Sequence, residues 1–316
     1  MKKAIVLGAT GGTGQVIVTE LLSRGIEVIA FGRSEKKLKN LITQNNSTPL
    51  LTYKLGDIFQ YQTIVEAAVD ADVIFQCANV QYHEMADKLH LLGESVMKAA
   101  DILGKKIVIV DGIYVYGFQI AKGDENHLKE PHTKKGKIRV EFEKLVFDKK
   151  WKNAKALIVR LPDYYGVTSQ NSYLQPTLTG LAADKISVFI GNLKTPREYV
   201  YLPDAAKMIV EIAIKDDSYG ENWNIPGGGL ITGKEIIKIA HEITGSRKLV
   251  IPLKKNAIRI LGLFDPVMRE AVEIMYLTEE GFILSGEKYE NRIGKIIATP
   301  YKAGLKETLK LLMNKG

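Results

Sequence analysis

The chain has 316 residues, of which 46% are hydrophobic and 25% are charged, and its formal net charge is +8 at pH 7. This length predicts one large domain with a smaller lobe, because a single core usually stops growing below it. The near-average composition excludes a disordered or fibrous chain. Basic residues are spread along the sequence without the interleaved aromatic residues of a nucleic-acid surface, so no nucleic-acid partner is expected.

Cysteine and histidine usage excludes two further kinds of site. Cys77 is the only cysteine, so no disulfide forms within a chain, and its apolar neighbours predict an inert thiol. The five histidines lack the H-E-x-x-H spacing of a zinc site, so no metal is expected. No stretch reaches the roughly 18 apolar residues of a membrane span. We expect a cytoplasmic protein with no membrane partner.

In chain order, the first half alternates short β-rich apolar runs with longer segments of helical periodicity. The runs predict strands at 3–7, 26–31, 50–54, 72–77, 106–110 and 155–160. The segments between them predict helices at 13–24, 35–45, 60–69, 84–103 and 134–150. This alternation is typical of a Rossmann-type α/β fold, in which helices cover both faces of a doubly wound parallel sheet.

The second half is less regular. It predicts helices at 173–183, 233–244, 255–280 and 302–314, and short strands at 187–192, at 197–202 and before Pro226. With no linker or repeat between the halves, we expect two interleaved domains. The expected Rossmann domain is 1–165, completed by part of 200–228, and the expected smaller C-terminal lobe for substrate is 166–199 with 229–316.

The strongest functional signal is the glycine-rich stretch "GATGGTG", directly between the first strand and the first helix. Glycines there permit a tight turn and a close approach of the backbone to a pyrophosphate, and the helix N-terminus attracts the anion. The strand and helix on either side favour this interpretation over a merely flexible loop. The predicted cofactor-binding residues of this stretch are Gly8, Thr10, Gly11, Gly12, Thr13 and Gly14.

The end of the second strand indicates which dinucleotide is bound. Proteins that bind NAD usually place an acidic residue there to hold the ribose hydroxyls. This chain has Gly32 followed by Arg33 and Ser34, and a guanidinium group suits the 2′-phosphate of NADP. We therefore expect NADP(H) in preference to NAD(H). The alternative is that Arg33 is a solvated loop residue.

A series of ordered motifs extends over nearly the whole chain. After "GATGGTG" they are "LGD" at 55–57, "YVYG" at 114–117, "RLPDYYG" at 160–166, "REYVYLPDAA" at 197–206 and "WNIPGG" at 223–228. With these motifs the chain resembles the extended short-chain dehydrogenase/reductases, the group of the nucleotide-sugar epimerases and dehydratases.

The resemblance implies further contacts with the cofactor and the substrate. Asp57, with Ile58 beside it, would meet the adenine, and Ala78 and Asn79 would border the cofactor. Residues 160–166 would line the nicotinamide end, which makes Tyr164 a substrate-binding candidate. Family members often form dimers through the helices that correspond to 84–103 and 134–150, so a homodimer is also implied.

The resemblance also shows a departure at the catalytic residues. The family relies on a Tyr-x-x-x-Lys pair, but its pattern lies over "KGKIRVEFE" and places Lys135 at the tyrosine and Arg139 at the lysine. Gly112 stands where a partner serine or threonine belongs. Arg139 can still bond the cofactor ribose, as the family's lysine does, but it remains protonated and cannot exchange a proton.

Other groups must therefore supply the proton if the chain is an enzyme. Lys135 would act as a general acid if burial and neighbouring cations favoured its neutral form, and Tyr114 and Asp111 are further catalytic candidates. The alternatives are a solvated Lys135, a Tyr114 that packs beneath the cofactor, and an Asp111 that caps the strand end.

Arg197 stands where sugar-nucleotide members of the family carry an arginine for the diphosphate, so it is the second substrate-binding candidate. A structural ion pair with Glu198 or Asp204 is the alternative. Three functions remain open. They are NADPH-dependent reduction or oxidation of a small carbonyl or alcohol compound with a nonstandard proton donor, noncatalytic NADP sensing, and nucleotide-sugar epimerase or dehydratase chemistry.

Overall fold

The structure is a computed structural model that describes residues 1–118, 122–169 and 172–314. The chain divides into two units, and several crossings of the chain connect them. The first unit comprises Met1–Gly112, Lys137–Arg160 and Ala206–Trp223, and the second comprises Ile113–Gly136, Leu161–Ala205 and Asn224–Gly316. Residues 113–136 belong to the second unit, whereas the expected Rossmann domain extended to residue 165. The functional domains themselves stay a prediction.

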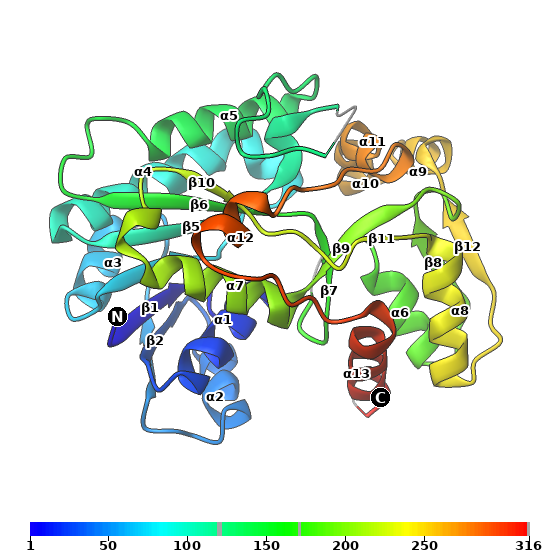
Figure 1. Ribbon diagram of the computed structural model, residues 1–316, viewed down its shortest axis with the longest axis horizontal. Coiled ribbons are helices and arrows are strands. Elements are labelled where there is room, and N and C mark those ends of the chain that lie inside the picture. The colour runs from blue at the N-terminus through cyan, green and yellow to red at the C-terminus, as the bar shows by residue number, and fades with distance from the viewer. Residues whose placement is uncertain (119–121, 170–171, 315–316) are drawn as a thin grey trace. The chain divides into compact units, whose positions relative to one another are not determined.

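A seven-stranded sheet with the order β10-β6-β5-β4-β1-β2-β3 dominates the first unit (Figure 1). Its strands are β1 (Lys3–Leu7), β2 (Glu27–Gly32), β3 (Leu51–Leu55), β4 (Val73–Gln76), β5 (Lys106–Gly112), β6 (Lys155–Leu161) and β10 (Asn222–Asn224). β1 lies between β2 and β4 and is parallel to both, so the strand order reverses at β1 and β4. This order confirms the predicted Rossmann-type fold.

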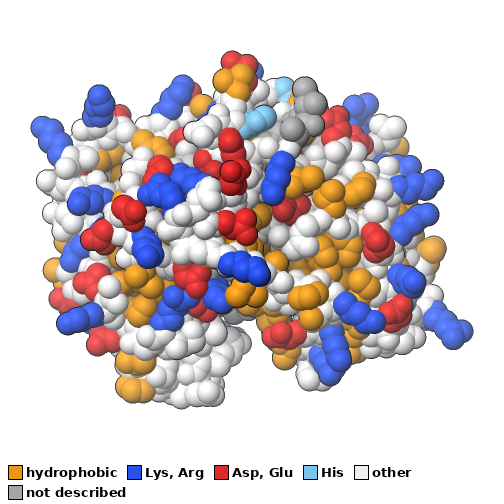
Figure 2. All heavy atoms as spheres, in the orientation of Figure 1, with side chains coloured by type: hydrophobic (Ala, Val, Ile, Leu, Met, Phe, Trp, Pro, Cys, Tyr) orange, Lys and Arg blue, Asp and Glu red, His pale blue; other side chains and the backbone are white. Residues whose placement is uncertain are grey.

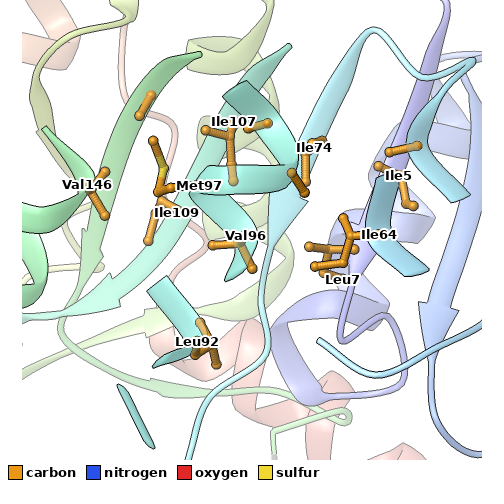
Figure 3. Close-up of a cluster of buried hydrophobic side chains, with 14 of the residues drawn as sticks. Ile5, Leu7, Ile64, Ile74, Leu92, Val96, Met97, Ile107, Ile109 and Val146 are labelled. Carbon is orange, nitrogen blue, oxygen red and sulfur yellow. The ribbon is translucent and has the colours of Figure 1, made fainter. Parts of the chain in front are cut away.

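Helices cover the sheet, which explains why its strands read as continuous apolar runs. The helices of this unit are α1 (Gly12–Ser23), α2 (Glu35–Gln44), α3 (Tyr61–Ala68), α4 (Met85–Leu103), α5 (Lys134–Val146) and the second half of α7 (Leu202–Ile214). On one face Ile5, Ile74 and Ile107 pack with Ile64 of α3 and Val96 of α4 in a single buried cluster (Figure 3). Figure 1 shows α1 and α7 on the opposite side of the sheet from α4 and α5.

One helix of this unit is shorter than its pattern predicts. The periodicity continues to residue 150, but α5 ends at Val146. The indole Nε1 of Trp151 donates to the carbonyl oxygen of Leu145 at 2.7 Å, and the amide of Lys150 donates to Asp148 Oδ1 at 2.8 Å. These bonds replace further helical bonds, so the chain turns at Asp148.

The second unit has its own core between small sheets and helices. One sheet has the order β11-β9-β7, and the other pairs β12 with β8. The strands are β7 (Asp163–Tyr165), β8 (Ser187–Ile190), β9 (Arg197–Tyr201), β11 (Leu230–Ile231) and β12 (Val250–Leu253), and the helices of the core are α6 (Gln175–Ala182), α8 (Gly233–Thr244) and α13 (Tyr301–Met313). Leu178, Ile236 and Leu305 join these helices in one buried cluster.

The predicted helix over 255–280 is wrong as a single element. The chain forms α9 (Lys255–Leu261), α10 (Pro266–Ala271), a 3₁₀ turn at Val272–Ile274 and α11 (Tyr276–Glu279). Gly262 lies where a Cβ atom would meet the Cα of Arg269 at 2.9 Å, and Pro266 cannot continue a helix that began before it. The sequence pattern also missed α7, β7, β11, β12 and α12 (Glu287–Arg292).

Candidate active site

The glycine-rich loop follows β1 at the point where the strand order reverses. Gly8 has a φ of +77°, and a Cβ atom on it would lie 2.7 Å from the amide nitrogen of Ala78. A Cβ atom on Gly14 would lie 2.2 Å from the carbonyl oxygen of Gly8. Only glycine fits at both positions, because the loop lies directly against the end of β4 and the start of α1. This is the crevice in which doubly wound sheets bind ligands.

The start of α1 suits an anion. Its N-cap residue is Gly11, which offers no side-chain cap, and the first turn, which includes Gly12 and Thr13, contains no acidic residue. The amide of Gly11 donates to the carbonyl oxygen of Gly8 at 2.9 Å, and Gln15 Nε2 donates to the carbonyl oxygen of Thr10 at 3.0 Å. The loop is thus fixed by its own bonds, and the positive end of the helix dipole carries no competing side-chain anion.

The end of β4 is held beside this loop. The side-chain amide of Gln76 accepts from the amide of Ala78 at 2.6 Å and donates to the carbonyl oxygen of Ala78 at 2.9 Å. The next residue, Asn79, is exposed, and its Oδ1 accepts from Arg139 Nη2 at 3.0 Å. The structure therefore brings Gly8, Ala78, Asn79 and Arg139 together, and their contacts with the cofactor stay a prediction.

The end of β2 presents cations to solvent. Arg33, Ser34, Lys36 and Lys37 are exposed, and the hydroxyl of Ser34 caps α2 by accepting from the amide of Lys37 at 3.4 Å. The first acidic residue after the strand is Glu35. Its carboxylate pairs with Lys39 Nζ at 2.9 Å and accepts from the hydroxyl of Tyr53 at 3.1 Å, which lowers the pKa of Glu35. Its existing partners place Glu35 with α2 and β3.

The predicted adenine residues lie in the turn between β3 and α3. Asp57 Oδ1 accepts from the amide of Phe59 at 3.0 Å, and the carbonyl oxygen of Asp57 accepts from the hydroxyl of Thr63 at 3.0 Å. Asp57 and Ile58 both keep partial exposure. Asp57 therefore shapes the turn, and its contact with adenine stays a prediction.

Arg139 belongs to a buried network of charges in the first unit. It forms an ion pair with Asp111, whose side chain is fully buried at the end of β5. Arg160 lies 3.9 Å from Asp111 Oδ2 through Nε, and its Nη2 donates to Glu143 Oε2 at 2.6 Å. Glu143 Oε1 in turn accepts from Asn222 Nδ2 at 2.8 Å. Two cations and two anions thus balance inside the unit, as buried charges require.

Lys135 lies in the second unit and is neither solvated nor isolated. Its side chain is 3% exposed, and its Nζ lies 2.5 Å from Glu270 Oε2 and 2.8 Å from Glu273 Oε1. Glu273 also accepts from the backbone amides of Lys134 and Lys135, at 3.0 and 3.2 Å, so it caps α5. Both carboxylates therefore hold the Lys135 ammonium group in a cluster of ion pairs. The solvated alternative is therefore wrong, and the role of Lys135 as a general acid stays a prediction.

Arg197 also has structural partners. Its side chain is 4% exposed, its Nη1 donates to the carbonyl oxygen of Ile190 at 3.1 Å, and its Nη2 lies 3.6 Å from Asp163 Oδ2. The rings of Tyr173 and Tyr199 lie 5.4 and 4.9 Å from its guanidinium carbon. An ion pair is present, but its acid is Asp163 rather than the expected Glu198 or Asp204. A role for Arg197 in substrate binding stays a prediction.

The remaining candidates are the two tyrosines, whereas the thiol of Cys77 was expected to be inert. Tyr114, in the 3₁₀ turn Ile113–Tyr116 directly after β5, and Tyr164, in β7, are both half-buried. Cys77 keeps partial exposure, but burial raises the pKa of its thiol. Among the residues that the structure describes, no group of three His, Cys, Asp or Glu side chains is arranged to hold a metal ion.

Sequence reasoning missed several of these partners. Glu143 stands four residues after Arg139, a helical spacing from which a shared face could have been inferred. No local signal connects Lys135 with Glu270 or Glu273, because the two segments lie 135 or more positions apart in the chain.

Comparison with known proteins supports the dinucleotide site. A family model described as NAD(P)H-binding matches residues 8–139. The UDP-glucose 4-epimerase of Rickettsia bellii (strain OSU 85-389) is 30% identical over 131 residues, which are 36% of this chain and 38% of that protein. The dTDP-4-dehydro-6-deoxyglucose reductase of Escherichia coli is 22% identical over 292 residues, which cover 84% of this chain and 86% of that protein.

Solved structures extend the comparison to the whole chain. The dTDP-glucose 4,6-dehydratase of Bacillus anthracis str. Ames, solved in complex with NAD, has a TM-score of 0.81 at 16% identity and covers 98% of this chain and 96% of that one. The chain therefore has the fold of that dehydratase, and its residues 8–139 match the NAD(P)H-binding family model. The match to the epimerase spans little more than a third of that protein.

Proposed function

We propose that the protein binds NADP(H) at the glycine-rich loop and transfers hydride to or from a small carbonyl or alcohol compound. The observation that carries this proposal is the glycine cradle, in which Gly8 and Gly14 leave no room for a Cβ atom. The family match over 8–139 and the length of the match to a reductase support it. When bound, the nicotinamide supplies the hydride chemistry, and the protein has to bind and orient the reactants.

The preference for NADP(H) rests on the end of β2. Arg33 is exposed beside Ser34, and Glu35 is already bonded to Lys39 and Tyr53. A guanidinium group there would bond the 2′-phosphate, and a charge-assisted bond of this kind contributes roughly 1.5–3 kcal/mol.

Calorimetric titration with NADPH and NADH tests this preference. Arg33→Asp should weaken NADPH binding about a hundredfold and leave NADH binding within a fewfold, because only NADPH carries the phosphate. Lys149→Asp makes the same change of charge at another exposed position of the first unit and should leave both affinities unchanged. Equal affinities of the unaltered protein for the two dinucleotides would remove the preference.

We infer that the proton donor is neither Lys135 nor Asp111. Arg139 and Asp111 neutralise each other, and Lys135 is held by two carboxylates. We keep Tyr114 as the candidate, because a phenol hydroxyl directly after β5 offers the chemistry of the family's tyrosine. If that is so, Tyr114→Phe should lower kcat roughly 10²-fold or more without changing NADPH affinity. Tyr61→Phe, in α3, is the matched control for loss of a phenol.

A second candidate function is noncatalytic NADP sensing. It is favoured by the ion pairs of Lys135 and Arg139, the two residues that stand at the positions of the family's catalytic pair, because both side chains already have partners inside the protein. NADPH oxidation on a panel of carbonyl compounds separates the two functions. Turnover of any member by the unaltered protein, with loss in Tyr114→Phe, supports the reductase. Tight NADPH binding with no turnover on the whole panel supports the sensor.

A further inference from the structure

One surface stretch of the second unit combines basic and apolar side chains without acidic ones. Residues 247–264, here termed the basic apolar segment, run from beyond α8 through β12 and α9 to the turn that follows α9. The segment contains no Asp or Glu, and its basic residues are Arg247, Lys248, Lys254, Lys255 and Arg259. Most basic residues of the chain lie elsewhere, but these five have no acidic residue between them.

The apolar side chains of this segment face solvent. Ile260 is 61% exposed, Leu263 is 69% exposed and Phe264 is 86% exposed, whereas Ile258 on α9 is buried. The turn that presents them is hydrogen-bonded: the amide of Leu263 donates to the carbonyl oxygen of Ile260 at 3.1 Å, and that of Phe264 to the carbonyl oxygen of Leu261 at 3.0 Å. Exposure of these side chains is therefore built into the local fold.

The basic side chains of the segment have no ion pairs in the described part of the chain. Lys254 and Arg259 are exposed and Lys255 is half-buried, and no carboxylate lies within salt-bridge distance of them there. Figure 2 shows Lys and Arg side chains along the right-hand edge, where Figure 1 places α9, β12 and α8. Charges without protein partners next to exposed apolar groups are available for an external partner.

We propose that the basic apolar segment docks on the surface of a membrane rich in anionic phospholipid. Such a surface has an apolar layer beneath negatively charged headgroups, so it can accept Leu263 and Phe264 while it pairs with Lys254, Lys255 and Arg259. The long aliphatic stems of the lysines suit this position, because they reach from the apolar layer to the headgroups.

Two other partners fit the chemistry less well. In a two-fold symmetric dimer the segment would face its own copy, and like charges would meet with no acidic residue of the segment to pair with them. Nucleic acid would use the cations and could stack a base on Phe264, but it gains little from the exposed Ile260 and Leu263, since bases stack on aromatic rings.

This contact differs from a membrane span. Among the helices in the described ranges, none is long and apolar enough to cross a bilayer. The expectation of no membrane partner rested on the same absence in the sequence. Surface docking needs only a short apolar stretch and neighbouring cations, so it goes beyond that expectation.

Co-sedimentation of the full chain with vesicles tests the proposal. The protein should sediment with vesicles of phosphatidylcholine and phosphatidylglycerol, and salt should weaken this binding because it screens the cations. Lys254→Gln combined with Arg259→Gln should lower the partition coefficient roughly 25-fold, since each basic residue near an anionic surface contributes about fivefold. Leu263→Ser combined with Phe264→Ser should lower it at least about tenfold.

The matched control combines Val69→Ser with Lys149→Gln, two exposed positions of the first unit, and should bind vesicles like the unaltered protein. NADPH affinity should be the same in all of these variants, which separates this proposal from the dinucleotide site. Three results would overturn it: no binding to the anionic vesicles at low salt, a dimer in sedimentation velocity that Leu263→Ser with Phe264→Ser abolishes, or duplex DNA binding that Lys254→Gln with Arg259→Gln abolishes.

Discussion

At the scale of single residues, Lys135 and Arg139 of α5 both form buried ion pairs. Arg139 neutralises the fully buried Asp111 and bonds Asn79 at the edge of the dinucleotide site. Lys135 joins the start of α5 to Glu270 and Glu273. Each of these two cations has an acidic partner within its own unit.

The Arg139 pair can be tested through stability. Arg139→Met should lower the free energy of unfolding by roughly 3–5 kcal/mol, because it leaves the Asp111 carboxylate buried without its main partner. The double variant Arg139→Met with Asp111→Asn should be more stable than the sum of the single effects implies. Urea unfolding of the four proteins measures the coupling. Additive effects would show that the two side chains do not depend on each other.

At the scale of elements, the junction of β1, the glycine loop and α1 determines the dinucleotide site. The loop places two separate requirements on Gly8. Its φ is left-handed, and its Cα lies so close to Ala78, just beyond β4, that a Cβ atom would not fit. Gly25, after α1, also has a left-handed φ of +70°, but a Cβ atom there would meet nothing within 4 Å. Gly25 therefore shows the effect of a left-handed backbone alone, and Gly8 shows the same effect together with a close approach.

Gly8→Ala and Gly25→Ala make this comparison. Gly25→Ala should cost about 1 kcal/mol for the backbone conformation alone and leave NADPH binding unchanged. Gly8→Ala should cost more than that and weaken NADPH binding at least about tenfold, because the new methyl group displaces the end of β4. Thermal unfolding and calorimetric titration provide the two measurements. Equal effects at both positions would contradict the close approach at Gly8.

At the scale of the whole molecule, buried acids of the second unit connect stability to pH. Glu198 accepts from the amides of Gly227 at 3.1 Å and Leu284 at 2.9 Å, and burial raises its pKa from 4.5 to about 7. Burial also raises the pKa of Asp163 from 3.8 to about 6. Both carboxyl groups hold protons more tightly in the folded protein, so their contribution is fully present at low pH and is lost as pH rises through these values.

The free energy of unfolding, measured in urea, should therefore fall between about pH 4 and about pH 7 as far as these two groups determine it. Glu198→Gln should reduce this fall by on the order of 3 kcal/mol, because it removes the group with the larger shift. Glu287→Gln, an exposed position of the same unit, is the control and should leave the slope unchanged. If Glu198→Gln left the dependence of the free energy of unfolding on pH unchanged, Glu198 would have the same pKa in the folded and the unfolded protein.

The sequence by itself determined the sheet and the glycine loop. Each of these features can be predicted from a few consecutive residues, because strand and helix periodicity and turn residues are local properties of the sequence. It gave the wrong extent for α5 and for 255–280, where bonds from Trp151 and the close approach at Gly262 end the helices.

Only the tertiary structure decided which charges pair. Glu273 lies 138 positions from Lys135 in the chain and caps α5. Arg197 pairs with Asp163 and not with the nearer acids in the sequence, Glu198 and Asp204. The outward position of Leu263 and Phe264 is likewise a result of the turn after α9. Such contacts depend on where distant segments meet after the chain has crossed between units, and no local pattern records that meeting.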